Sequence, residues 1–259
     1  MKHNRNLLII FIFILLVSFV AYADTYALII GVGDYEDDNL GDLPGAVKDA
    51  QQISQMLIRL GIVEEENLTL VTNPGYLDLL IQIEEWVEKG DKDDQMIFYF
   101  GGHSQEGINA SGKTDTYLMP KDVKTRFLDR SAYNFREEWQ ERLSQKLKAS
   151  ETLMIFDTCY AGGITTERGL KDIQLRSLEF EKIAEERNVN FLFSSKENQT
   201  SKEREAEPGG WFTYYLLEGI GTGAANYNKD LRIDAEEISR YIEERVSAST
   251  KGEQTPISI

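Results

Sequence analysis

The sequence predicts an α/β protein with a mostly parallel central sheet and helices on both faces. Apolar runs that are typical of strands alternate with segments of helical period along the chain. The runs are nearly continuous rather than alternately polar, as in parallel strands that are buried on both faces. No repeat of fixed period and no low-complexity block interrupts this order, so one domain accounts for the chain after its leader.

The N-terminal segment is predicted to be a secretory signal peptide. Lys2 and Arg5 precede an almost unbroken apolar run from Leu7 to Val20, and small residues follow at Ala21-Tyr22-Ala23. The predicted leader is therefore residues 1–23, and cleavage after Ala23 leaves residues 24–259 as one exported domain, periplasmic or secreted. The alternative is an uncleaved membrane anchor, but the run is shorter than the roughly 20 residues of a spanning helix.

Strands and helices alternate in the first part of the mature chain. Pro44 suits the first turn of a helix, where its missing N–H is tolerated, and Gly61 ends that helix. In chain order, the elements are a strand at Thr25–Val32, a helix at Pro44–Leu60, a strand at Asn67–Thr72, a helix at Tyr76–Lys89 and a strand at Gln95–Phe100.

The same alternation continues after an irregular segment. Residues Ser104–Asp129 have no helical period and are predicted to form a loop with a small hairpin. Polar and charged loops are expected at Gly162–Ser177 and Glu197–Gly210. The remaining elements are a helix at Phe135–Leu147, a strand at Thr152–Phe156, a helix at Leu178–Arg187, a strand at Val189–Phe193, and helices at Trp211–Gly219 and Ala235–Val246.

The charge of the chain excludes one class of partner. A formal net charge of −16 argues against nucleic acid, because binding to phosphates requires a surplus of Lys and Arg. An acidic surface is compatible with cationic substrates. Gly31-Val32-Gly33 follows a strand as in dinucleotide-binding motifs, but the third glycine is missing and acidic residues follow, so nucleotide binding is not expected.

Two reactive side chains follow two predicted strands. Cys159 is the only cysteine, so an intramolecular disulfide is impossible, and His103 is the only histidine after the leader. Both come directly after strands, and the carboxyl ends of parallel strands form the ligand-binding edge of such sheets. A thiolate with a neighbouring imidazole is a nucleophile with its general base and acid. The alternative is a buried structural cysteine and an unrelated loop histidine.

The neighbours of this pair fit acyl transfer. Gly101-Gly102 and Gly162-Gly163 permit tight turns that present backbone N–H groups to a developing oxyanion. Asp157 lies two residues before Cys159, so on an extended strand both side chains point to the same face. Asp157 could orient the pair or line a substrate pocket. The pocket is favoured, because a carboxylate beside a thiolate raises the pKa of the thiol.

Several segments together resemble the metacaspase and bacterial caspase-like peptidase family. The first three are YALIIGVGDYEDDNLGDLPGAVKD from Tyr26 to Asp49, FYFGGHSQEG around His103 and IFDTCYAGG around Cys159. The resemblance continues through SSKENQTSKE and WFTYYLLEGI and covers essentially the whole mature chain. The 56-residue spacing between histidine and cysteine agrees with the roughly 50 residues noted for caspases. The resemblance implies a caspase-like three-layer fold.

The resemblance also implies roles for individual residues. His103 would be the general base and acid and Cys159 the nucleophile, with backbone N–H groups of Cys159 and Ser104 forming the oxyanion hole. Metacaspase-type members cleave after Arg or Lys, and the acids that match Asp49 and Asp157 line their primary pocket. A pair of carboxylates is suited to holding a guanidinium.

The sequence departs from the family pattern near both catalytic positions. Gly101-Gly102-His103-Ser104 stands where Ser-Gly-His-Gly is usual, and Tyr160-Ala161-Gly162 replaces the common x-Ser-Gly after the cysteine. Neither departure changes the histidine or the cysteine.

Regulation is suggested by two sets of charged residues. Arg168, Lys171 and Arg176 follow Cys159 in a loop that family members often cut during activation, although solvated loop charges explain them as well. Some family members are activated by calcium, for which Asp115, Asp122 and Asp129 are candidate ligands.

A calcium-loop spacing near the C-terminus is interpreted differently. It runs from Asn226 to Glu237, but Leu231 occupies its glycine position and Arg232 adds a cation. It is therefore predicted to be a polar turn that caps the last helix.

The sequence as a whole predicts a monomeric, exported cysteine endopeptidase. It is expected to hydrolyse polypeptides after Arg or Lys through a thioester, with no organic cofactor and no assigned metal site. One alternative is a catalytically silent binding or scaffold protein with a caspase fold. The other is an active peptidase that prefers non-basic residues.

Overall fold

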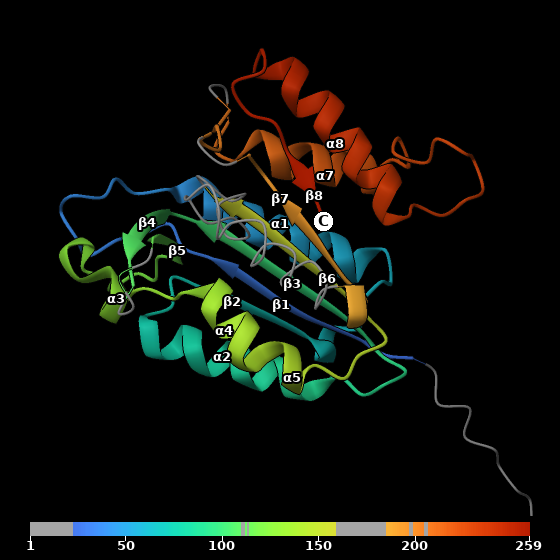
Figure 1. Cartoon of the computed structure of the whole chain (residues 1–259). Helices are drawn as coiled ribbons and strands as arrows, with labels where there is room; N and C mark the ends of the chain where they lie inside the picture. The colour runs from blue at the N-terminus through green and yellow to red at the C-terminus, as the bar shows by residue number, and fades with distance from the viewer. Residues whose placement is uncertain (1–22, 110–111, 113, 159–184, 197–198, 205–206) are drawn as a thin grey trace, which may run out of the picture.

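The computed structural model describes residues 23–109, 112, 114–158, 185–196, 199–204 and 207–259 (Figure 1). Within them, six strands form the central sheet in the order β2-β1-β3-β6-β7-β8. Neighbouring strands from β2 to β7 are parallel, and β8 pairs antiparallel with β7. The strands are β1 (Thr25–Gly31), β2 (Leu68–Thr72), β3 (Gln95–Gly102), β6 (Glu151–Thr158), β7 (Val189–Phe193) and β8 (Ile257–Ser258).

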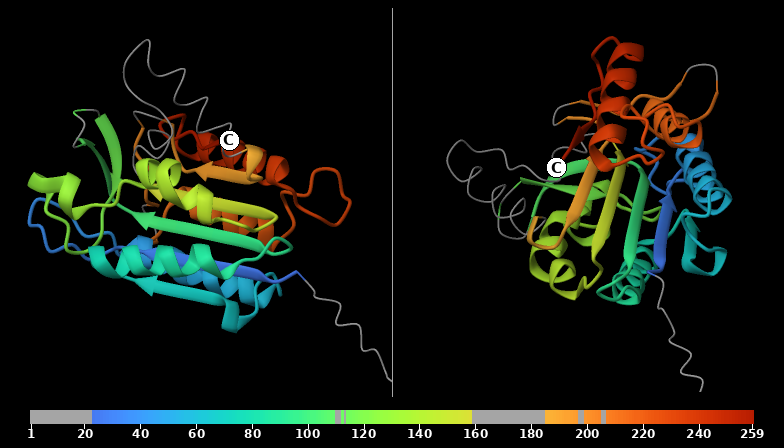
Figure 2. Two further views of the ribbon diagram at one scale, coloured as in Figure 1. Left: turned by 60° about the horizontal axis from the view of Figure 1, so that its bottom comes forward. Right: turned by 90° about the vertical axis from the view of Figure 1, so that its right-hand side faces the viewer.

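Helices cover both faces of this sheet, which confirms the predicted three-layer α/β class (Figure 2). On one face lie α1 (Pro44–Arg59), α7 (Trp211–Gly221) and α8 (Ala235–Ser249), which bury apolar side chains against β1, β3, β6 and β7. On the other face lie α2 (Tyr76–Lys89) and the helical segment made of α4 (Phe135–Glu138), η3 (Trp139–Leu143) and α5 (Ser144–Lys146).

A glycine in β1 permits close packing of α1 on the sheet. A Cβ at Gly31 would lie 2.8 Å from both the Ala46 carbonyl oxygen and the Ala50 Cβ. Gly31 therefore serves the contact between helix and strand.

The segment after β3 contains the small hairpin that the sequence predicts. Its strands are β4 (Ser104–Ile108) and β5 (Thr114–Leu118), which pair antiparallel outside the central sheet. Short helical turns follow at η2 (Thr125–Phe127) and α3 (Leu128–Ser131), and another, η1 (Glu65–Asn67), precedes β2.

One predicted element differs from the structure, one strand was not predicted, and one predicted helix is largely outside the described residues. The helix expected at Phe135–Leu147 is interrupted by the π-helical turn Trp139–Leu143, whose Trp139 and Leu143 are fully buried. Strand β8 was not predicted, because two residues carry no periodic pattern. Most of the helix expected at Leu178–Arg187 lies outside the described residues.

The turn before α8 has the predicted capping role. Asp234 caps the helix by accepting from the Glu237 backbone, and Glu237 in return accepts from the backbone of Asp234. Glu237 also accepts from the Asn228 backbone at 3.0 Å, so these polar groups form hydrogen bonds with one another. In the part of the chain that the structure describes, no helix has the length and apolarity needed to cross a membrane.

Candidate active site

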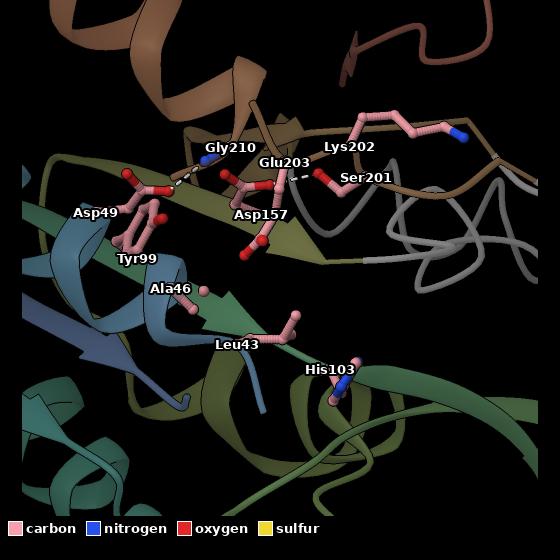
Figure 3. Close-up of a pocket in the computed structure, with 12 residues that line it drawn as sticks. Leu43, Ala46, Asp49, Tyr99, His103, Asp157, Ser201, Lys202, Glu203 and Gly210 are labelled. Carbon is pink, nitrogen blue, oxygen red and sulfur yellow. Dashed lines mark hydrogen bonds between the residues drawn. The ribbon is translucent and has the colours of Figure 1, made fainter. Parts of the chain in front are cut away.

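A small cavity lies at the carboxyl ends of β3 and β6, at the edge of the sheet that the sequence indicated (Figure 3). Its volume is about 70 Å³. Its walls come from the N-terminal half of α1, from the two strand ends and from the segment that precedes α7. The lining side chains include Leu43, Asp49, Tyr99, His103, Asp157, Ser201, Lys202 and Glu203.

His103 lies one residue beyond β3 and is half-buried. Its Nε2 is 2.9 Å from the carbonyl oxygen of Gly41. A carbonyl oxygen can only accept a hydrogen bond, so this contact favours the tautomer in which Nε2 carries the proton. Nδ1 of the neutral ring then has a free lone pair, as a general base requires.

Ser104 lies beside the end of β6. Its buried hydroxyl donates to the Thr158 hydroxyl at 3.1 Å, and Thr158 is the last residue of that strand. Ser104 is therefore held next to the position that precedes Cys159 in the chain. Cys159 itself lies outside the described residues, as do Arg168, Lys171 and Arg176.

Asp49 and Asp157 come from different elements and meet at the inner end of the cavity. Asp49, on α1, is 4% exposed and accepts from the Gly210 backbone N–H at 2.7 Å. Asp157, on β6, accepts from the Ser201 hydroxyl at 2.7 Å and from the Thr213 hydroxyl at 2.8 Å. The structure thus brings together the two acids that the resemblance implied.

Two adjacent glycines allow this approach. A Cβ at Gly210 would lie 3.0 Å from an Asp157 carboxylate oxygen and 3.6 Å from one of Asp49. At Gly209, where φ is +128°, a Cβ would lie 2.6 Å from Asp49 Oδ1. Sequence reasoning assigned no role to these glycines, although a Gly-Gly pair directly before a helix was visible.

Burial raises the pKa values of both acids, and the charge of Asp157 raises that of Asp49 further. The pKa of Asp49 is raised to about 8, first by burial and then by the charge of Asp157, against the opposing effect of the Gly210 N–H. Burial also raises the pKa of Asp157, while the hydroxyls of Ser201 and Thr213 act in the opposite direction. A cation that enters the cavity would favour the ionised form of both carboxyls.

Glu203 is a third acid in the cavity wall, and the sequence analysis gave it no role. Its backbone pairs with Gly210 across a narrow two-strand bridge, which directs its carboxylate towards the cavity (Figure 3). Lys202 also lines the cavity, but its ammonium group turns away and lies 3.0 Å from Glu253. The carboxylates of Asp49, Asp157 and Glu203 therefore make the inner cavity acidic.

The three acids suggested as calcium ligands have separate partners. Asp115 forms a buried ion pair with Arg136 at 2.7 Å, and Asp122 accepts from the Tyr76 backbone at the start of α2. Asp129 lies 3.7 Å from Arg130. Among the described residues, no group of three or more His, Cys, Asp or Glu side chains is placed to hold a metal ion. The described structure therefore does not bring these three carboxylates together.

The sheet and this cavity define a caspase-like protein. The chain belongs to the caspase domain family of cysteine peptidases, whose model matches residues 24–258. Solved structures that share the fold include a protein of Geobacter sulfurreducens and caspase-1 from Spodoptera frugiperda. No curated protein sequence matches significantly.

Both structural matches extend over nearly the whole of each chain. The Geobacter protein is 16% identical, with a TM-score of 0.63 over 91% of this chain and 92% of the other. The insect caspase-1 is 17% identical, with a TM-score of 0.61 over 92% of this chain and 88% of the other. At these identities the matches establish the fold alone.

Proposed function

We propose that this protein is a cysteine endopeptidase that hydrolyses peptide bonds after Arg or Lys. The observation that carries the proposal is the pairing of Asp49 and Asp157 in the cavity that His103 also lines. Two carboxylates can hold a guanidinium through parallel charge-assisted hydrogen bonds, and an ammonium through its charge. An acidic side chain would meet repulsion in the same place.

The proposed reaction proceeds through a thioester. His103 takes the proton of the Cys159 thiol, and the thiolate attacks the carbonyl carbon of the basic residue. Backbone N–H groups of Cys159 and Ser104 stabilise the oxyanion. His103 then gives the proton to the leaving amine as the C–N bond breaks. Water, deprotonated by His103, attacks the thioester and releases the carboxylic acid and the thiol.

The untested sequence predictions on processing belong to the same proposal. We expect the leader to be removed in the exporting host, so that the mature protein begins at Asp24 and acts as an exported monomer. Cleavage after Arg168, Lys171 or Arg176 is the expected self-processing event. Calcium is a candidate activator without an assigned site, since Asp115, Asp122 and Asp129 are otherwise engaged.

The proposal is tested with fluorogenic peptides that end in Arg, Lys or Asp. Residues 24–259 are expected to cleave the Arg and Lys peptides, and Cys159→Ala is expected to abolish this turnover. Asp49→Asn and Asp157→Asn should each lower kcat/KM for Arg peptides by about 10- to 100-fold, since each removes a charged hydrogen-bond partner. Asp93→Asn, an exposed acid between α2 and β3, is the matched control.

Two outcomes would contradict the proposal. Silence on all peptides, with or without calcium and after limited proteolysis, would favour a catalytically silent binding protein. Turnover that depends on Cys159 but is unaffected by Asp49→Asn and Asp157→Asn would favour a peptidase with different primary specificity.

A further inference from the structure

Two residues of the loop between β1 and α1, Tyr35 and Gly41, contact the candidate catalytic histidine. Tyr35, in this loop, accepts a hydrogen bond from the His103 backbone N–H at 2.7 Å. The phenol hydroxyl in turn donates to the Val32 carbonyl at 3.2 Å. The Tyr35 ring lies against the imidazole, with ring centroids 4.8 Å apart and the planes tilted by 45°. The same loop supplies the Gly41 carbonyl that contacts Nε2.

This loop is fixed at several points along its length. The Leu43 N–H donates to the Gly33 carbonyl at 2.7 Å, which closes the base of the loop. The side chain of Asn73, at the end of β2, accepts from the backbone of Gly33 at 2.8 Å and of Asp34 at 3.1 Å. The Tyr35 hydroxyl in this loop therefore has a defined position relative to β3 and can hold the histidine backbone in place.

The residue before the histidine, Gly102, leaves space for the Tyr35 hydroxyl because it has no side chain. Gly102 has a φ of +157°, and a Cβ there would lie 2.9 Å from the Tyr35 hydroxyl oxygen. Any side chain at position 102 would therefore push the phenol away from the His103 backbone. The family pattern also has a glycine here, whereas the neighbouring positions differ in this chain.

We propose that Tyr35 is a positioning residue for His103. Its hydroxyl fixes the histidine backbone and its ring fixes the tilt of the imidazole, while Gly41 holds Nε2, so that Nδ1 is the ring nitrogen left to take up a proton. This inference rests on the proposed peptidase function, in which His103 transfers the proton. In this scheme Tyr35 acts through the histidine.

The kinetic test compares Tyr35→Phe with Tyr227→Phe. Tyr227 is an exposed tyrosine whose hydroxyl also makes one hydrogen bond, to Glu244 at 2.9 Å, away from the cavity. Tyr35→Phe is expected to lower kcat for an Arg peptide by about 10- to 100-fold, because small displacements of catalytic groups have effects of this size. KM should change less than about twofold, since the acidic pocket is untouched. Wild-type kcat in Tyr35→Phe would overturn the proposal.

A second measurement does not depend on activity. His103 is the only histidine in residues 24–259, so its imidazole C–H signals in the proton NMR spectrum are unique. Tyr35→Phe keeps the aromatic ring, so these signals move only if loss of the hydroxyl reorients the imidazole relative to its surroundings. We expect them to move in Tyr35→Phe and to stay in Tyr227→Phe, with melting curves confirming that both variants fold.

The two measurements separate the possible failures. If the wild-type protein cleaves no peptide but the histidine signals move in Tyr35→Phe, the peptidase proposal fails and the positioning contact stands. If the signals stay in place in Tyr35→Phe, the positioning role is wrong whatever the activity of the wild type.

Discussion

At the scale of single residues, the ionised form of Asp49 is unfavourable for folding but is the form that the proposed function requires. Its carboxyl is buried beside a second carboxyl, and its pKa of about 8 lies far above the ordinary value of 3.8. Between these two values the folded protein binds more protons than the unfolded chain, so the contribution of Asp49 to stability falls as the pH rises. The same ionised carboxylate is the form that attracts a cationic substrate.

Asp49→Asn is therefore expected to have opposite effects on stability and activity. The substitution should raise Tm at pH 8 and have little effect near pH 4, where Asp49 is protonated in the folded state. In the wild type, KM for Arg peptides should fall as the pH rises towards 8, and this dependence should weaken in Asp49→Asn. Melting curves and KM measurements across this range test both effects; an equal Tm shift at both pH values would contradict the assignment.

At the scale of elements, the segment between α8 and β8 holds the acidic pocket in place. Gln254 is fully buried in this segment. Its side-chain oxygen accepts from the Lys202 backbone at 2.9 Å, and its amide nitrogen donates to the Ser194 carbonyl at 2.9 Å and to the Ser201 hydroxyl at 3.2 Å. Because Ser201 donates to Asp157, this one side chain connects the C-terminal segment to the pocket.

Gln254→Leu should destabilise the protein and weaken the binding of basic substrates. The leucine removes the partner of the buried Ser194 carbonyl and of the half-buried Lys202 N–H, and a buried group left unsatisfied costs about 1–3 kcal/mol. Urea denaturation should show this loss, and KM for Arg peptides should rise as Ser201 loses its support. Gln145→Leu, on the exposed side of α5, is the control and should leave both quantities unchanged. A destabilised variant with normal KM would show that Gln254 stabilises the fold without supporting the pocket.

The sequence predicted some of these elements and not others, for physical reasons. Strand patterns predicted β1, β2, β3, β6 and β7 of the central sheet, and the position of His103 at the end of β3 followed from its apolar run. Asp49 was identified by resemblance alone, since nothing local distinguishes it from other acids, whereas the place of Asp157 two residues before Cys159 already indicated a pocket residue. Tyr35 and Gln254 act through contacts with residues distant in the chain, which no periodic pattern reveals. The π-helical turn in Trp139–Leu143 was missed because its apolar spacing resembles that of an α-helix.

At the scale of the whole molecule, the strong negative charge acts on approaching substrates. A formal net charge of −16 attracts cationic peptides over a distance that salt shortens, to about 10 Å at 0.1 M ionic strength. The acidic cavity lies within this field, so under the proposed specificity the capture of a basic peptide would combine long-range attraction with the local pocket.

Raising the ionic strength should therefore lower kcat/KM for a multiply cationic Arg peptide more than for a neutral one. The neutral peptide would carry the same Arg together with a compensating Glu distant from the cleavage site. Steady-state kinetics in a salt series, with kcat followed separately, measures the difference. Equal slopes for the two peptides would show that the net charge does not contribute to capture.

The acidic pocket needs residues from late in the chain, so it can form only near the end of synthesis. Asp49 accepts its hydrogen bond from Gly210, 161 positions later in the chain, and Asp157 depends on Ser201 and Thr213. A nascent chain that has not yet produced and docked these late residues has no complete place for a basic side chain. Under the proposed function, such a protein becomes able to cleave basic substrates only with the last steps of folding, and its unfinished copies leave neighbouring proteins uncut.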